Sequence, residues 1–257
     1  MEIIELTTED REISLPQGAD VLLIDRPASG MLPEERRFHL AEGASAQYLL
    51  IADEYADGGR DADEADGRLR RQWQLEKGSD LRAYYIFLGG GRSEWLLEHE
   101  VGESASIESR SLFIGKNEDG LEVKADYDFV GFKSYGRIAV DALLGDKSSM
   151  RYDASANVLP TAQLSDTRID MRLRLDGKEA HGRITPALNI AANDVKAGHS
   201  ASTYQLSQED LFYLRTRGLE PQAIRRLLAV SLSRNFILGL ADADTAAKVL
   251  ELIESHL

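Results

Sequence analysis

Histidine and cysteine are the side chains best suited to hold a transition metal, and this sequence has five histidines but no cysteine. Without cysteine there are no disulfides, no thiolate nucleophiles and no metal or cluster sites built on thiolate ligands. The histidines are scattered, with no close metal-ligand spacing: His39, His99, His181, His199 and His256. An isolated histidine is more often a hydrogen-bonded structural residue than a ligand, so spacing alone predicts no metal site.

Carboxylates offer a second kind of chemistry. Asp153, Asp166 and Asp170 lie in a region of β patterning, and β-helix bodies host many enzymes that cleave polysaccharides with acidic residues. An alternative function is therefore a carboxylate-dependent, carbohydrate-active β-helix enzyme with a bound cation. Solvated strand faces explain the aspartates more simply, and Trp73 and Trp95 are too few to build a groove that stacks sugars.

No segment has the spacing of a nucleotide-binding loop. The run 89–91 is three glycines after an expected strand, but it lacks the G-x-G-x-x-G spacing and a following helix, so we interpret it as a turn. There is no P-loop motif either. The chain would therefore need a partner for any work driven by ATP.

Charge and composition exclude several classes of protein. The formal net charge is −14, a field that repels phosphate backbones and argues against nucleic-acid binding. No window approaches 18 uncharged apolar residues, so no membrane span is expected. The first residues lack the basic and apolar regions of a signal peptide. We therefore expect a cytoplasmic globular protein.

A repeated β pattern must position these residues. Short apolar runs recur from about residue 2 to 202, each after a turn with glycine, at Gly18, Gly43, Gly78 and Gly102. The intervals are 25, 35 and 24 residues, and the long one contains an acidic stretch, 53–67, that we interpret as an inserted surface loop. A repeat of this length favours a solenoid. Periodicity alone leaves a β-sandwich as an equal alternative.

The pattern changes to helical after Ser202. Ser207 and Asp210 form a capping arrangement at the start of one helix, and Gly218 ends it. Pro221 opens a second helix, and a third is expected over roughly 244–256. The sequence thus predicts two domains, a β core over 1–203 and a helical domain over 204–257.

Two consecutive segments in this part of the chain resemble a known family. The segment from Pro186 to Ser202 resembles the SufB/SufD pattern P-x-L-x-I-x-x-x-D-V-K-x-x-H-x-A-T. The segment from Gln208 to Leu219 is similar to the run D-x-x-L-F-Y-L-x-S-R-G-I of the same family. Upstream, the segment from Tyr135 to Val140 looks like the G-x-I-x-V strand of the family. Ala180 stands where the family has an alanine before the P-x-L-x-I strand. Before about residue 100 the resemblance rests on topology.

The resemblance implies a mainly β protein, a right-handed parallel β-helix followed by a small α-helical domain. Members of the family form a dimeric scaffold, SufB with SufD or a homodimer, that carries two copies of the ATPase SufC on the helical domain. A transient iron–sulfur cluster would form at the β-helix interface, with no stably bound cofactor and no catalysis by the scaffold itself. Residues that the resemblance places in or beside the docking helices are Asp210, Leu211, Phe212, Tyr213, Arg215 and Arg217.

His199 matches the histidine that SufD-type members link to cluster assembly, which makes it a tentative metal ligand. Ala197 stands where the SufD pattern often has cysteine, and Ser200 where the SufB pattern has glutamate. With no thiolate, the chain has no group to accept sulfur as a persulfide, so we expect a SufD-like role. Because β patterning begins at the first residues, we expect no counterpart of the N-terminal helical region usual in the family. A plain homo-oligomeric structural protein would differ from a scaffold only in whether an ATPase binds.

Overall fold

The computed structural model describes residues 1–26, 35–53, 69–89 and 91–257, and describes only the backbone of Gln208 and Leu211. The predicted acidic loop 53–67 lies outside this part of the chain except for Asp53, as does Gly90 of the glycine turn. Strands and then helices follow one another along the described residues: β1 (Glu2–Glu5), β2 (Glu12–Leu15), β3 (Asp20–Asp25), β4 (Glu35–Leu40), β5 (Ser45–Ala52), β6 (Leu69–Leu75), β7 (Asp80–Leu88), β8 (Arg92–Val101), β9 (Ser106–Gly115), β10 (Gly120–Phe129), β11 (Tyr135–Leu144), β12 (Ser149–Val158), β13 (Asp166–Leu175), β14 (His181–Ile190), β15 (Lys196–Gln205), α1 (Gln208–Thr216), α2 (Pro221–Ile237) and α3 (Ala243–His256).

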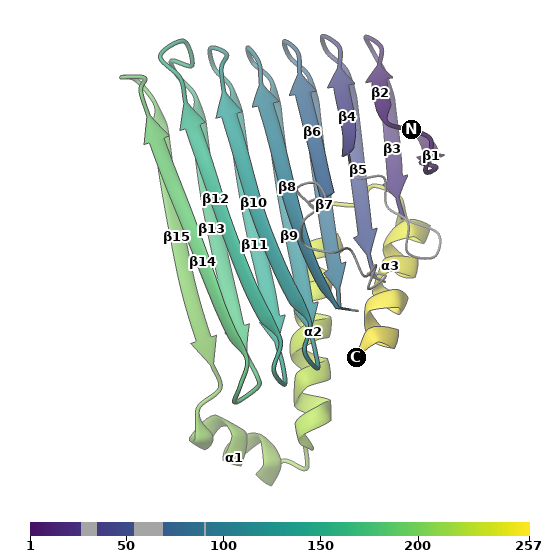
Figure 1. Cartoon of the computed structure of the whole chain (residues 1–257), viewed down its shortest axis with the longest axis vertical. Coiled ribbons are helices and arrows are strands. Elements are labelled where there is room, and N and C mark those ends of the chain that lie inside the picture. Colours follow the sequence, from purple (N-terminus) through teal and green to yellow (C-terminus); the bar gives the residue numbers. More distant parts are fainter. Residues whose placement is uncertain (27–34, 54–68, 90) are drawn as a thin grey trace, which may run out of the picture.

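The strands form two parallel sheets that face each other (Figure 1). Odd-numbered strands β1 to β15 build one sheet, called sheet A here, and even-numbered strands β2 to β14 build the other, sheet B. The chain alternates between the sheets, so each pair of strands adds one rung to a solenoid. A sandwich of antiparallel hairpins would not give parallel pairing between every second strand. The predicted parallel β-helix is therefore confirmed, and the sandwich alternative is wrong.

The spacing of the glycine turns reappears in the register of sheet A. Asp20 pairs with Ser45, Ser45 with Asp80, and Asp80 with Ser106. Each step brings the same part of the rung back to the same place on the stack. The acidic stretch therefore lengthens one rung without shifting the register of the strands that follow it.

The core fills the space between the sheets. Alternate residues of each strand point inward, so the burial pattern of a strand such as β12 alternates along its length. Inward side chains on successive rungs stack into columns, among them Phe38 on Trp73, with ring centroids 4.0 Å apart. Leucine, alanine, valine and aromatic residues from nearly all the strands form this single cluster. A rung buries its apolar face only against its neighbours, so the core is continuous along the stack.

The helices begin where local chemistry predicts. Ser207 caps α1, accepting from the backbone N–H of Asp210, and Pro221 occupies the first turn of α2. The third helix spans Ala243–His256, close to the predicted range. Strand β15 continues to Gln205, so the predicted boundary at 203/204 falls inside this strand.

Helices α2 and α3 pack on the outer face of sheet A. A second apolar cluster joins outward side chains of the sheet, such as Leu49, Ile86 and Leu112, to Phe236 and Ile253 of the helices. Hydrogen bonds at the edges of this interface also join the helical segment to the solenoid. Arg225 donates from Nη2 to the carbonyl of Gly115 at 2.8 Å, and the backbone N–H of Ala241 donates to Oε1 of Gln47 at 3.0 Å. Among the described residues, no helix has both the length and the apolar character needed to cross a membrane.

Candidate functional site

The C-terminal end of the solenoid is open. Strands β14 and β15 are the last strands of sheets B and A, and each pairs on one side only, with β12 and β13 respectively. Each has ten residues, and most of their side chains are exposed or half-buried. The opposite end is different, since β1 and β2 have four residues each and begin with glutamate. Long unpaired strands are templates for pairing with another chain, whereas short charged ones discourage it.

His199 lies on the inward column of this open end. The register pairs Ile169 of β13 with His199 of β15 and Met171 with Ala201. Ile169 and Met171 are fully buried. Because paired residues of parallel strands point to the same side of a sheet, His199 also faces the interior of the solenoid. It is nevertheless exposed, because no further rung covers it.

The surroundings of His199 leave room for a second molecule. Its inward neighbours along β15 are Ala197 and Ala201, which are small and carry no polar group. Among the described residues, no group of three or more histidine, cysteine, aspartate or glutamate side chains is arranged to hold a metal. The arrangement can therefore contribute one imidazole to a metal or cluster, and the remaining ligands would have to come from elsewhere.

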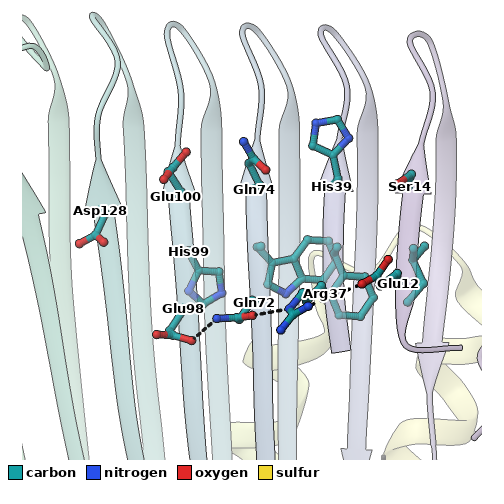
Figure 2. Close-up of a pocket in the computed structure, with 13 residues that line it drawn as sticks. Glu12, Ser14, Arg37, His39, Gln72, Gln74, Glu98, His99, Glu100 and Asp128 are labelled. Atoms are coloured by element: carbon teal, nitrogen blue, oxygen red, sulfur yellow. Dashed lines mark hydrogen bonds and ion pairs between the residues drawn. The ribbon is translucent and has the colours of Figure 1, made fainter. Parts of the chain in front are cut away.

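A hollow of about 520 Å³ lies on the outer face of sheet B, away from the helices (Figure 2). Polar side chains from neighbouring strands line it and bind one another. Gln72 donates to Glu98 at 2.8 Å, Arg37 donates to Gln72 at 3.1 Å, and His39 lies 3.2 Å from Glu76. These contacts are those of a solvated strand face.

The structure separates the carboxylates considered for sugar chemistry. Asp153 lies on the outer face of sheet B beside Arg151, at 2.8 Å. Asp166 and Asp170 lie on the outer face of sheet A, and Asp170 pairs with Arg168, also at 2.8 Å. The two tryptophans are buried in the core, so neither offers a stacking surface. The three aspartates therefore do not form one site.

The residues predicted for partner docking lie on α1, below the solenoid in Figure 1, except Arg217, which is the C-cap residue of this helix. Phe212 is 70% exposed and Tyr213 is 57% exposed, and Arg215 and Arg217 are exposed beside them. The guanidinium of Arg217 donates to the hydroxyl of Tyr213 at 3.0 Å. The side chain of Leu211 lies outside the described part of the chain.

Asp210 has a structural task as well. Its Oδ2 accepts from the backbone N–H of Ser207 at 3.1 Å and from the hydroxyl of Tyr204 at 3.3 Å. The hydrogen bonds to Ser207 hold the pKa of Asp210 below its usual value. Asp210 therefore ties α1 to the end of β15, the strand that carries His199.

Sequence reasoning missed a charged cluster in the core. Arg36, Arg71 and Asp25 are fully buried and meet Tyr48 inside the first rungs. Burial raises the pKa of the Tyr48 phenol well above its usual value, with the Asp25 carboxylate adding to the shift. Alternation places Arg36 and Arg71 at inward positions of β4 and β6, and that was the signal available in the sequence.

Comparison with known proteins places this chain in a family. The family model described as the SufBD core domain of SUF system FeS cluster assembly matches residues 13–231. The chain belongs to the SufB/SufD family. It is 29% identical over 178 residues to the iron–sulfur cluster assembly protein SufD of Escherichia coli K12, covering 67% of this chain and 41% of that protein.

Other SufB/SufD relatives match over different shares of the chain. A SufBD family protein of Mycobacterium tuberculosis H37Rv is 28% identical over 258 residues, which covers 93% of this chain and 61% of the relative. SufD of Bacillus subtilis is 24% identical over 127 residues, 49% of this chain and 29% of the relative. The chain thus spans less than two thirds of the length of these relatives. The match confirms the predicted family and its link to iron–sulfur cluster assembly.

Proposed function

We propose that this chain is a SufD-like scaffold subunit of an iron–sulfur cluster assembly complex. A second scaffold subunit, either another copy or a SufB-type chain, pairs with the open end at β14 and β15. A SufC-type ATPase docks on α1 and the neighbouring part of α2. The scaffold positions the other subunits and catalyses no reaction itself. The observation that carries this proposal is the open end of the solenoid. The edge strands β14 and β15 each have ten residues and pair on one side only, and β15 carries His199.

The cluster would form where the two subunits meet. It is the cargo of the complex, held transiently, and this chain offers it the His199 imidazole. Because the chain contains no cysteine, sulfur must arrive on thiolates of another subunit. A cysteine-bearing partner subunit therefore fits cluster assembly better than a homodimer does.

The docking of the ATPase is supported by the exposed aromatic pair on α1. Phe212 and Tyr213 of this nine-residue helix are exposed to water, which is unfavourable for their apolar rings. Burial of these rings in an apolar groove of a partner would stabilise the complex. On the next helix, Leu227 of α2 is 56% exposed. Arg215 and Arg217 beside the two rings favour a partner surface that is acidic around an apolar centre.

The test is co-purification with a SufC-type ATPase from the same organism, followed by size-exclusion chromatography with light scattering. We expect a complex with two ATPase copies per scaffold dimer, lost on deletion of residues 207–257. Phe212→Ala with Tyr213→Ala should abolish the complex, whereas Tyr135→Ala, an exposed tyrosine on the solenoid, should retain it. If the chain does not bind the ATPase, it shares the fold of the family without this function.

A separate measurement tests His199. His199→Ala should lower the yield of assembled cluster in the complex without dissociating it. His181→Ala, on the outer face of the neighbouring edge strand, is the matched control and should leave the yield unchanged. Equal yields in the two variants would assign His199 a structural role or none.

A further inference from the structure

Helix α1 and the first turns of α2, residues 207–227, are called the docking arm here. The arm carries the side chains on which the ATPase docks in the proposed function, and it lies at the lower edge of the solenoid (Figure 1). Among its described side chains only Ile224 is buried, and Ile224 belongs to neither apolar cluster. The apolar contacts that hold α2 on sheet A begin at Leu228. Polar contacts are therefore expected to fix the orientation of the arm.

Arg225 joins the arm to the lower turns of the solenoid. Its Nη2 donates to the carbonyl oxygen of Gly115 at 2.8 Å, and its Nη1 lies 3.2 Å from Oδ2 of Asp146. The same two oxygens also accept from the backbone N–H groups of Gly145 and Asn117, each at 3.0 Å, and these bonds stack one turn on the next. The guanidinium therefore binds two stacked turns at once. Charged donors of this kind make the stronger hydrogen bonds in proteins.

The guanidinium has room on these turns because residue 145 is glycine. A Cβ on Gly145 would lie 2.2–2.4 Å from three atoms of the Arg225 guanidinium, and these are the three atoms nearest to it. Non-bonded atoms do not approach each other so closely, so a methyl group at this position would displace the guanidinium. The backbone of Gly145 does not have a positive φ, so alanine can adopt its conformation. Gly145→Ala should therefore release Arg225 while the turn itself stays folded.

A second link ties the other end of the arm to the solenoid. The hydroxyl of Tyr204, at the end of β15, donates to Oδ2 of Asp210 in the first turn of α1 at 3.3 Å. Phe212 and Tyr213, the exposed aromatic residues, lie between the two links in the sequence. The docking surface is thus held to the solenoid on both sides, by Tyr204 and by Arg225.

We propose that Arg225 is a positioning residue for the ATPase, which holds the docking arm in the orientation that the ATPase binds. This inference rests on the docking in the proposed function. Arg225 acts through the arm, because its guanidinium is bound on the turns and its side chain is only 19% exposed. A surface that is already oriented loses less conformational freedom on association. If the arm could swing, only a fraction of the molecules would present Phe212 and Tyr213 correctly, and the apparent affinity would fall in proportion.

The orientation of the arm can be measured in the isolated chain. Because the chain contains no cysteine, two spin labels can be attached after Glu209→Cys on α1 and Glu122→Cys on the outer face of sheet B. Double electron–electron resonance should then give a narrow distribution of distances between the labels. Arg225→Gln and Gly145→Ala should both broaden this distribution. A distribution that stays equally narrow in both variants would overturn the inference.

The effect on docking is measured by isothermal titration calorimetry with a SufC-type ATPase, after circular dichroism has verified that each variant is folded. Arg225→Gln and Gly145→Ala should weaken the affinity about tenfold. Arg225→Lys keeps the charge but lacks the paired donors, so it should weaken the affinity less than Arg225→Gln does.

Arg110→Gln is the matched control for the loss of an arginine. Nη1 of Arg110 in β9 donates to the carbonyl oxygen of Asn235 at 3.2 Å, near the other end of α2. The apolar cluster already holds α2 there through Phe236. The affinity of Arg110→Gln for the ATPase should therefore stay within about twofold of that of the unchanged chain.

The outcomes separate this inference from the proposed function. If Arg225→Gln and Gly145→Ala bind the ATPase as tightly as the unchanged chain, Arg225 is not a positioning residue, and the proposed docking stands. If the unchanged chain does not bind the ATPase at all, the proposed function is overturned, and this inference with it.

Discussion

The hydroxyl oxygen of Tyr85 lies 2.8 Å from Nε2 of His99, inside the solenoid. The other ring nitrogen, Nδ1, lies 3.3 Å from the carbonyl oxygen of Asp126, which can only accept. Nδ1 therefore carries the proton, and Nε2 accepts from the Tyr85 hydroxyl. The imidazole also stacks on Tyr127 with ring centroids 4.5 Å apart. Burial lowers the pKa of His99 to about 3, so the ring is neutral in the folded protein.

Stability should therefore fall as pH decreases below about 6.5. Between the unfolded pKa of about 6.5 and the folded pKa of about 3, His99 binds a proton only in the unfolded state. This one group contributes a slope of up to about 1.4 kcal/mol per pH unit. His99→Gln should flatten the dependence of the urea midpoint on pH, and His181→Gln on the exposed edge strand should not. An unchanged slope in His99→Gln would contradict this account.

The core cluster at the N-terminal rungs predicts a large effect of one substitution. The Asp25 carboxylate accepts from Tyr48 at 2.6 Å and from Nε of Arg71 at 2.9 Å, and lies 3.3 Å from Nε of Arg36. Asp25→Asn removes the charge that the two buried guanidinium groups share. We expect a loss of about 3–5 kcal/mol in the free energy of unfolding, measured with urea.

The matched control for Asp25 is Asp53, which pairs with Arg26 at 2.7 Å. Arg26 is half exposed, so water screens this pair and Asp53→Asn should cost less than about 1 kcal/mol. Equal losses in the two variants would show that burial of the Asp25 cluster has no energetic consequence.

Local stability of α1 should depend on its cap. Ser207→Ala removes the acceptor for the backbone N–H of Asp210, at 3.0 Å, and should cost about 1 kcal/mol. A nine-residue helix is marginal on its own, so the loss should appear as faster hydrogen exchange over residues 208–216. Ser231→Ala, on the exposed face of α2, should leave that exchange unchanged. A lowered midpoint of global unfolding in Ser207→Ala would instead show that α1 unfolds together with the solenoid.

Two glycines should respond to alanine in opposite ways. A Cβ on Gly131 would lie 2.0 Å from the backbone nitrogen of Glu103, so Gly131→Ala must push two stacked turns apart. We expect a loss of about 1–3 kcal/mol in the free energy of unfolding. A Cβ on Gly198 would meet nothing nearer than 3.6 Å, at Arg168, so Gly198→Ala should be neutral or stabilise by up to about 1 kcal/mol. A neutral Gly131→Ala would mean that the turns can separate freely.

Several features could be predicted because they depend on neighbours in the sequence. The capping box of Ser207 and Asp210 and the first-turn position of Pro221 involve residues a few positions apart. The four glycine turns were predicted correctly, and Gly18, Gly43 and Gly78 have positive φ. Gly102 also lies in the predicted turn, but for a different reason. Gly102 is needed because a Cβ would lie 2.5 Å from the carbonyl oxygen of Leu75, and the left-handed residue of that turn is Ser104.

Alternation could have indicated the buried arginines of the charged core, but their pairing with Asp25 could not be predicted from the sequence. Arg36 and Arg71 are polar by type, and the partner that makes their burial tolerable, Asp25, lies on a different strand of the other sheet. Such a contact depends on the stacking of rungs, and a sequence pattern carries no direct record of it. The same holds for Tyr84, which packs edge-on against Phe236 of α2.

The sequence by itself determined the repeat, the three helices and their caps, and the family to which His199 and the α1 aromatic residues point. Only the tertiary structure decided that His199 faces inward on an uncovered rung and that Phe212 and Tyr213 are exposed to solvent. The reason is physical. Turns and caps are formed by hydrogen bonds across a few residues, whereas exposure depends on which rung comes next, and after β15 the described structure has none.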